Sequence, residues 1–385
     1  MDVEFSEEQQ EIRRALRDAL DKQSDSPAVR AAMATEHGYD AKVWRRLCDQ
    51  TGLAGLGIPE EYGGVGFGFT EVVIALEEMG RALFPSPFLA SSVMAASALL
   101  HGADEEARTE YLPGIAEGSL LAALALAEPG TRDLAAIALP ATATADGGYR
   151  LDGVKTHVVD GALAGLILVA ARLDGETALF AVDADAAGLT RTALPVLDQT
   201  RRQARLDFAD TPARLLGTPG AATEKALERV RQLTEVAIAA ESVGGAARCL
   251  DMTVEYSKIR VQFGRAIGSF QALKHRCADL YVALETSRSA LYYAAWAAAE
   301  AEAAGLDVDP AAPGAGELAL MAPLAMTQAT AAYRHLAEET IQLHGGVGFT
   351  WEHDVHLYLK RATTSALLFG PRTRQRERIA ALAGI

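Results

Sequence analysis

The sequence predicts a mainly helical α+β protein: a helical N-terminal domain over 1–121, a central β-domain over 122–219 and a C-terminal four-helix bundle over 220–385. The first region carries helical hydrophobic periodicity broken by glycine and proline, the second has short strand-like segments, and the third has two very long helical patterns. A chain of 385 residues also exceeds the usual size of one hydrophobic core. We therefore expect two or three domains.

The N-terminal domain is predicted to begin with a capped helix. Ser6 precedes Gln9 by three residues, which is the spacing of a capping box, and the helical pattern then continues to about Lys22. Helical periodicity returns four times, and glycine or proline separates the segments. These segments are 41–52, 70–80, 91–101 and 105–117.

The central region has the features of a compact β-domain. Short segments rich in β-branched and aliphatic residues are separated by turn signals such as Asp146-Gly-Gly and Asp174-Gly. The predicted strands include 149–152, 166–170, 178–182 and 205–208.

The C-terminal region is predicted to be a bundle, because the patterns over 221–259 and 272–304 each exceed 30 residues. Gly244 and Gly245 fall inside the first of them. A glycine pair costs helix propensity, so close helix packing or a ligand is expected to compensate. Residues 307–316, rich in proline, glycine and alanine, are predicted to be a loop.

Composition and charge exclude several function classes. The net charge of −15 argues against nucleic-acid binding, which needs a basic face. The longest apolar run, 161–171, is too short to cross a bilayer, and the acidic N-terminus does not resemble a signal peptide. We therefore expect a cytoplasmic protein without a membrane partner. The isolated cysteines are expected to be packed thiols: Cys48, Cys249 and Cys277.

Two short segments in the C-terminal half give the clearest indication of function. Arg260-Val-Gln-Phe-Gly is followed by Phe270-Gln, and Gln342-Leu-His-Gly-Gly-Val-Gly-Phe follows about 80 residues later. Arginine grips phosphate in a bidentate manner, and glycine lets a backbone approach a ligand closely. The two segments together indicate a site for a large phosphate-bearing cofactor. The chain has no G-x-G-x-x-G fingerprint, so a Rossmann site is not expected.

These segments resemble those of the acyl-CoA dehydrogenase family of flavoproteins. Ile58-Pro-Glu-Glu-Tyr-Gly-Gly and Ala127-Glu-Pro-Gly are also similar to family motifs, and the resemblance covers nearly the whole chain in the same order. It implies the same three-part fold, FAD as cofactor, an acyl-CoA substrate and an electron-transfer flavoprotein as acceptor. The implied reaction is α,β-oxidation of the acyl thioester, in which a base takes a proton from Cα and a hydride passes from Cβ to flavin N5.

The resemblance also implies that two subunits, either two copies or this chain and a paralogue, share each FAD. A dimer or a dimer of dimers is therefore expected. One half of the site would be donated to the neighbouring subunit's cofactor by Arg260, Gln262, Phe263, Gln271, Gln342, Gly345 and Gly346.

The half of the flavin site that the chain would keep for itself departs from the family pattern. Ala127 stands where the family usually has threonine, and His157 stands where it has tryptophan. Val159 replaces a hydroxyl residue that would hydrogen-bond the ring. Backbone groups of Leu126, Val158 and Val159 are the flavin contacts that the resemblance still implies.

The position of the catalytic base departs from the family pattern as well. The family's usual base corresponds to Phe369, and a less common one corresponds to Thr234, so neither position holds a carboxylate. Glu235 is the next residue but points about 100° away on a helix. Glu241 lies on the same face as Thr234, about 10 Å along the axis, and is our candidate base. A structural role for Glu241, such as pairing with an arginine, is the alternative.

Two further patterns are interpreted as non-catalytic. His353 and His356 have the spacing of two metal ligands, but no third ligand is evident, so no metal is expected. The arginine-rich segment 372–378 has the pattern of a solvated helix face, with a role near CoA phosphate or a partner subunit as the alternative.

Three functional hypotheses remain open. The first is an active FAD-dependent acyl-CoA dehydrogenase with an unusual base. The second is a catalytically degenerate subunit of a heteromeric dehydrogenase, which donates Arg260 and Gln342 to a partner's FAD. The third is a flavin-independent acyl-CoA binding protein on the same scaffold.

Overall fold

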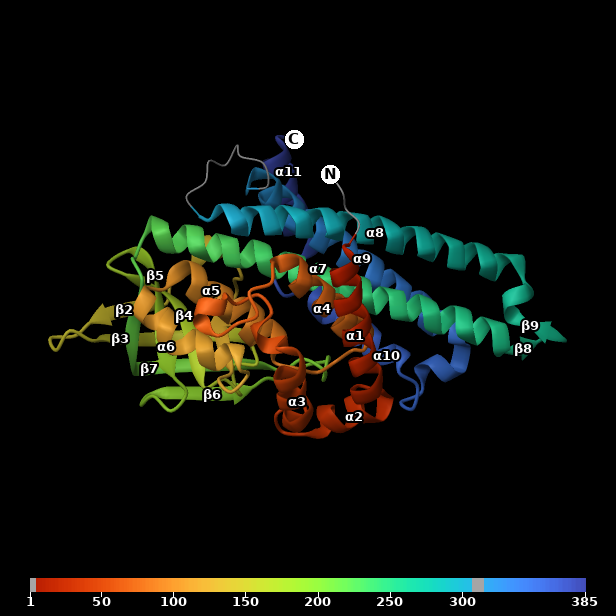
Figure 1. The fold of residues 1–385 in the computed structure, drawn as a ribbon, viewed down its shortest axis with the longest axis horizontal. Helices are drawn as coiled ribbons and strands as arrows, with labels where there is room; N and C mark the ends of the chain where they lie inside the picture. Colours follow the sequence, from red (N-terminus) through yellow and green to blue (C-terminus); the bar gives the residue numbers. More distant parts are fainter. Residues whose placement is uncertain (1–4, 307–314) are drawn as a thin grey trace.

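The computed structural model describes residues 5–306 and 315–385 and shows helices, then strands, then helices along the chain (Figure 1). The N-terminal helices are α1 (Glu7–Gln23), α2 (Ser26–Ala34), α3 (Ala41–Thr51), α4 (Phe69–Arg81), α5 (Ala96–Gly102) and α6 (Glu105–Ala116). The capping box at Ser6 and Gln9 is confirmed. The predicted helix over 91–101 is helical throughout, but its first part belongs to a π-helical segment, Leu89–Ala95, that leads into α5.

The central strands close into a barrel. They are β1 (Ala122–Ala125), β2 (Pro140–Ala143), β3 (Tyr149–Val159), β4 (Leu166–Leu173), β5 (Glu176–Asp183), β6 (Leu189–Ala193) and β7 (Gln203–Leu216). The circuit β4-β2-β3-β7-β5 returns to β4, because β5 pairs with both β7 and β4. β1 adds to β4, and β6 adds to β7.

Successive residues of β4 face two different cores, as the period of a strand requires. Ile167 and Val169 pack inside the barrel. Leu166 and Leu168 belong to the core that the barrel shares with the helices. The β-domain is therefore anchored to both helical regions by one face of its sheet.

The C-terminal bundle consists of α7 (Ala221–Ile259), α8 (Gln271–Ala304), α9 (Ala315–His344) and α10 (Val355–Ser365), followed by α11 (Arg372–Ala383). A short hairpin, β8 (Val261–Gln262) and β9 (Arg265–Ala266), joins α7 to α8. The two long predicted helices are confirmed. Most of the predicted loop over 307–316 lies outside the described residues.

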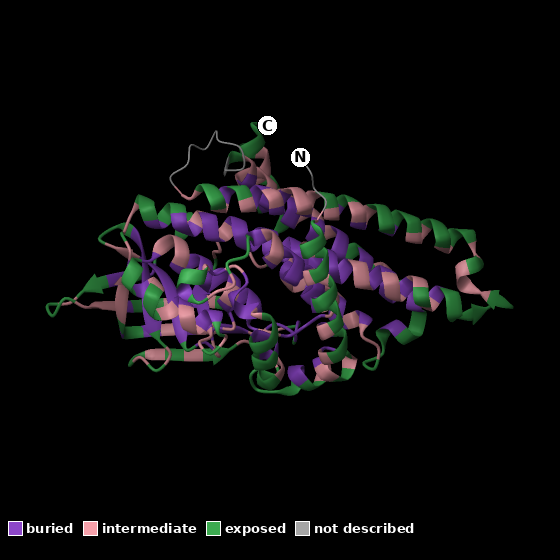
Figure 2. Ribbon diagram, in the orientation of Figure 1, coloured by how far each residue is buried: buried purple, intermediate pink, exposed green. Residues whose placement is uncertain are grey.

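Close packing compensates for the glycine pair of α7. A β-carbon on Gly244 would come within 1.8 Å of the carbonyl oxygen of Glu77 on α4. A β-carbon on Gly245 would come within 2.4 Å of the Tyr333 ring on α9. α7 therefore runs through the middle of the molecule with its central turns buried, and only its last turns reach the exposed far end (Figure 2).

Candidate active site

A small cavity lies where the β-domain meets α7 and the segment before α11. Its volume is about 40 Å³. It is lined by Met94, Leu124, Leu126, Ala127, Arg132, Thr156, His157, Val158, Val159, Thr234, Ile238, Leu368 and Phe369. The fold thus gathers Leu126, Val158 and Val159 at one place, as the retained half of a flavin site requires.

The two positions at which the resembled family holds a base both line this cavity. Thr234 comes from α7, and Phe369 comes from the segment between α10 and α11. The Thr234 hydroxyl donates a hydrogen bond to the carbonyl of Val230 in its own helix, at 2.7 Å. No aspartate or glutamate is among the lining residues. The described part of the cavity therefore offers no carboxylate to take a proton.

A buried ion pair fixes the wall between β1 and β3. The Lys155 ammonium donates to Glu128 Oε1 at 2.7 Å and to the carbonyl of Leu126 at 3.1 Å. Glu128 also accepts from the backbone N–H groups of Ala138 and Leu139. Burial lowers the pKa of Lys155 to about 8, although Glu128 opposes the shift. Lys155 thus holds the turn after β1 against β3.

His157 contributes an imidazole to the cavity lining, and its backbone has an uncommon conformation. Its φ is +52°, which non-glycine residues seldom adopt, and the pairing of β3 with β7 is irregular here. Its Nδ1 lies 3.0 Å from Gln203 Oε1, so Nδ1–H donates to the amide oxygen. His157 and Arg132 are the titratable side chains of the lining.

Glu241 lies elsewhere, within a buried charge network. Its Oε2 accepts from Arg201, and its Oε1 lies 3.6 Å from Arg361 Nη1. Arg361 in turn donates to Asp198 Oδ2 at 3.0 Å. Glu241 does not line the cavity. Its catalytic role stays a prediction, and these contacts favour the structural alternative.

The donated half of the site lies at the opposite end of the bundle. Arg260 follows Thr234 by 26 residues, which corresponds to about 39 Å along α7. Gln262 and Phe263 form the β8–β9 hairpin, which Figure 1 shows far from the β-domain. A single chain therefore cannot bring the two halves together.

The end of α7, just before Arg260, meets the segment that begins at Gln342 at this far end. The Tyr256 and His344 rings stack, with centroids 4.4 Å apart, and His344 Nδ1 lies 2.7 Å from the Thr340 carbonyl oxygen. These contacts hold the end of α9 against α7. Gly345 and Gly346 then follow at the surface, where a β-carbon would meet no atom within 4 Å. Their backbone is open to an incoming group.

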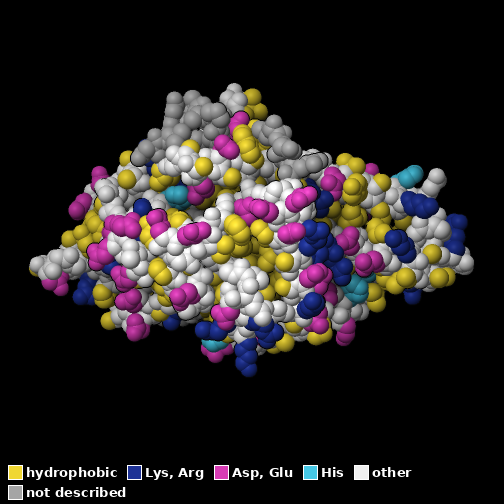
Figure 3. Space-filling view, in the orientation of Figure 1, with side chains coloured by type: hydrophobic (Ala, Val, Ile, Leu, Met, Phe, Trp, Pro, Cys, Tyr) yellow, Lys and Arg dark blue, Asp and Glu magenta, His cyan; other side chains and the backbone are white. Residues whose placement is uncertain are grey.

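The donated residues are exposed. The Phe263 side chain is 90 % exposed, and the one described hydrogen bond of the Gln262 side chain goes to the Val261 carbonyl. Figure 3 shows hydrophobic side chains among lysines and arginines at this end of the bundle. The remaining members of the set, Gln271 and Gln342, are also exposed. This surface suits a partner that lies outside the chain.

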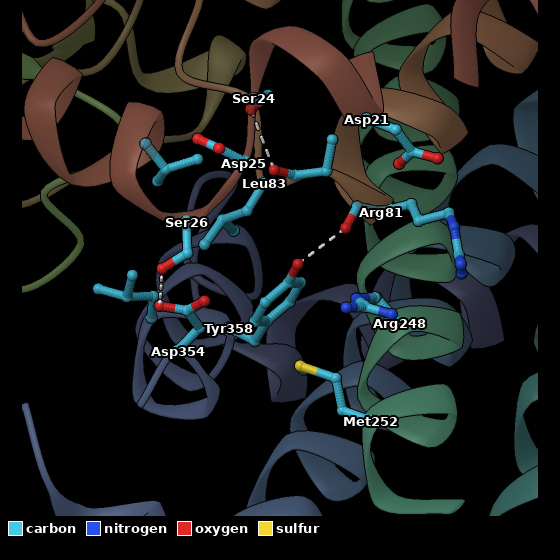
Figure 4. A pocket seen from close by; sticks show the side chains of 13 residues that line it. Asp21, Ser24, Asp25, Ser26, Arg81, Leu83, Arg248, Met252, Asp354 and Tyr358 are labelled. Atoms are coloured by element: carbon cyan, nitrogen blue, oxygen red, sulfur yellow. Dashed lines mark hydrogen bonds between the residues drawn. The ribbon is translucent and has the colours of Figure 1, made fainter. Parts of the chain in front are cut away.

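A larger cavity of about 410 Å³ contains none of the predicted site residues. It lies between the α1–α2 junction, the end of α4, α7 and α10 (Figure 4). Its polar groups largely pair with each other or with near neighbours. Ser26 donates to Asp354, Tyr358 donates to the Arg81 carbonyl, and the Arg81 guanidinium binds Asp251. We therefore place the candidate site at the smaller cavity.

Comparison with known proteins identifies the family. The family model of the acyl-CoA dehydrogenase N-terminal domain matches residues 6–119, and that of the C-terminal domain matches residues 225–383. The chain is 38% identical to the Mycobacterium tuberculosis protein "Acyl-CoA dehydrogenase IpdE2" over 95% of this chain and 94% of that one. The chain belongs to the acyl-CoA dehydrogenase family.

Solved structures of acyl-CoA dehydrogenases agree with the fold. One is a variant of the steroid ACAD Tcur3481-Tcur3483, with a TM-score of 0.86, 31% identity and 98% coverage of both chains. Another is the ChsE4-ChsE5 complex from Mycobacterium tuberculosis, with a TM-score of 0.87, 29% identity and coverage of 100% of this chain and 99% of that one. The three-part fold and the oxidoreductase class are thereby confirmed. In the described part of the chain, no helix is long and apolar enough to span a bilayer.

FAD, the cofactor of acyl-CoA dehydrogenases, fits the two halves of the site unequally. The donated half presents an arginine, an amide and open glycine backbone, which suit a dinucleotide phosphate. The retained cavity holds about 40 Å³. Ligand sites usually measure about 300–1,000 Å³. As the side chains stand, the retained half does not accommodate an isoalloxazine ring.

Sequence reasoning missed several residues that shape the site. The buried Lys155–Glu128 pair, Arg132 and the partners of Glu241 all come from segments distant in sequence. The one available signal was a lysine within the predicted β-domain, because a lysine that becomes buried must find a partner. Nothing in the sequence pairs Arg201 or Arg361 with Glu241.

Proposed function

We propose that this chain works as one half of a heteromeric acyl-CoA dehydrogenase and donates Arg260 and Gln342 to the FAD of a paralogous subunit. The absence of a carboxylate from the described lining of its own cavity carries the proposal, because Cα proton removal needs a positioned base. The exposed donated half supports the same conclusion, since it is open to a neighbouring chain.

Two of the similar structures add support. Their names are those of pairs of chains, Tcur3481-Tcur3483 and ChsE4-ChsE5, and the first is described as a steroid enzyme. A steroid-derived acyl thioester is therefore the first substrate to test. When bound, FAD supplies the hydride acceptor for oxidation at Cβ. This chain would contribute a phosphate grip through Arg260 and backbone donors at Gly345 and Gly346.

The alternative is an acyl-CoA dehydrogenase that is active alone with Glu241 as its base. The two arginines around Glu241 count against this alternative, because a base must reach the proton that it removes. An electron-transfer flavoprotein would accept the electrons in either case.

The decisive experiment compares the chain alone with the chain co-expressed with each paralogue from its own genome. The flavin spectrum, the mass of the assembly and bleaching by an acyl-CoA are measured. We expect a colourless or unbleached chain alone, and one FAD per two chains in an active complex. Stoichiometric flavin that an acyl-CoA bleaches in the chain alone would refute the proposal. Thioester binding without flavin in any assembly would favour the flavin-independent binding protein.

A further inference from the structure

A larger hollow adjoins the small cavity. It measures about 530 Å³ and lies between α7, α11 and residues 132–135. Arg132 and Phe369 line both spaces, so the hollow and the cavity share a wall. A thioester approaching the cavity from this side would have to pass through it.

A buried glutamate joins α7 to α11 beside this hollow. The Glu235 side chain is 0% exposed, and its Oε1 accepts from Arg231 Nη1 at 2.9 Å and from Arg378 Nη1 at 2.6 Å. Glu228 extends the network, since it pairs with Arg231 and lies 3.5 Å from Arg378. We call Glu235, Arg231 and Arg378 the clamp. Removing one partner of such a pair leaves an uncompensated buried charge, so the clamp holds α11 against α7.

The clamp has two effects on the hollow. It occupies cations that could otherwise bind a phosphate, and Arg374 is occupied likewise by Asp133 at 3.3 Å. It also fixes α11, whose Gln375 side chain donates to the Phe369 carbonyl at 2.8 Å. Phe369 is thereby kept in the cavity wall.

We propose that the clamp excludes acyl-CoA from this chain, so that in the heteromeric enzyme the thioester binds only in the partner subunit. Glu235 acts here as a positioning residue, through the two arginines and α11. The inference rests on the proposed heteromeric function and adds a physical reason for one thioester site per pair of chains.

The test measures binding of S-methyl-coenzyme A, an unreactive thioether, to the full-length chain by calorimetry at a pH above about 8, where Glu235 carries its charge. Glu235→Gln keeps the shape of the side chain but removes its charge, so that Glu228 is the one carboxylate of the network left to hold Arg231 and Arg378 away from phosphate. Glu377→Gln is the matched control, because Glu377 lines the same hollow, is exposed and has no described ion pair. We expect Glu235→Gln to bind at least about tenfold more tightly than the unaltered chain, which is about 1.4 kcal/mol. Glu377→Gln should change the affinity less than about twofold, because screening makes exposed charges weak.

A second readout separates the clamp from a simple fold defect. Burial raises the pKa of Glu235 to about 8, against the effect of Arg231, so the carboxylate gains charge as pH rises through that value. Facing it are Arg231 and Glu228 on α7 and Arg378 on α11. Affinity of the unaltered chain for the probe should fall as pH rises through about 8, and that of Glu235→Gln should stay flat.

Two results would overturn the inference. One is stoichiometric binding by the unaltered chain that Glu235→Gln does not improve, and the other is an equal gain from Glu377→Gln. If Glu235→Gln does not fold, Arg378→Gln, with a partly exposed side chain, replaces it. It should then speed hydrogen exchange of α11, and unchanged exchange would count against the clamp. The inference can fail while the heteromeric function holds, because flavin content and activity of the complex are measured separately.

Discussion

Thr234 and Phe369 line one cavity although they come from α7 and from the segment before α11. A hydroxyl that donates within its own helix and a phenyl ring thus occupy the two positions that the family resemblance assigns to a base. Both residues line the same cavity and neither has a carboxylate. Neither can therefore act as the base in place of the other. Under the proposed function, the base therefore has to come from another subunit.

The first prediction concerns the donated arginine. Arg260→Ala should lower flavin retention of the assembled complex at least about tenfold, because a charged phosphate contact is worth about 1.5–3 kcal/mol. Flavin released on gel filtration measures the effect. Lys258→Ala is the control, since Lys258 is exposed at the same helix end. Equal flavin loss in both variants would show that only net charge matters.

The second prediction compares two glycines. Gly244→Ala should destabilise the protein by about 3 kcal/mol, because the new methyl group would overlap the Glu77 carbonyl. Gly346→Ala meets no atom within 4 Å in the chain and should leave the unfolding free energy unchanged. Only the second variant should weaken flavin retention in the complex. Urea unfolding of both variants measures their stability. A Gly244→Ala protein as stable as the unaltered chain would contradict the prediction.

The third prediction tests the role of Glu241. Glu241→Ala should cost about 3 kcal/mol of stability, because it leaves Arg201 buried without its carboxylate. The double variant with Arg201→Met should recover part of this loss, since no unpaired charge then remains at that position. Flavin bleaching in the heteromeric complex should be unaffected. Loss of bleaching in a well-folded Glu241→Gln complex would instead support Glu241 as a base.

The fourth prediction is a pH dependence. The pKa of Lys155 is about 8 in the folded protein and 10.5 when unperturbed. Between these values the unfolded chain binds more protons, so the contribution of Lys155 to the unfolding free energy rises with pH. Lys155→Met should remove this rise, whereas Lys258→Met should keep it. Urea unfolding at about pH 8 and about pH 10 measures the difference, and parallel behaviour of all three proteins would contradict the assignment.

The sequence by itself determined the order of the three regions and the family. Helical periodicity reports which face of a helix is buried, so the long helices α7 and α8 were predicted to within one residue. Motifs such as Arg260-Val-Gln-Phe-Gly are contiguous, so they can be recognised in the sequence before the fold is known. The prediction that neither base position holds a carboxylate came from the same contiguous motifs.

Only the tertiary structure decided what surrounds each charged group. Glu235 and Glu241 are both buried acids on one helix, yet one binds Arg378 of α11 and the other binds Arg201 of the β-domain. Side-chain partners from distant segments depend on how the helices and the barrel pack, and periodicity carries no information about that packing. The same reason explains why the size of the cavity, and the distance between the two halves of the site, appear only in the folded chain.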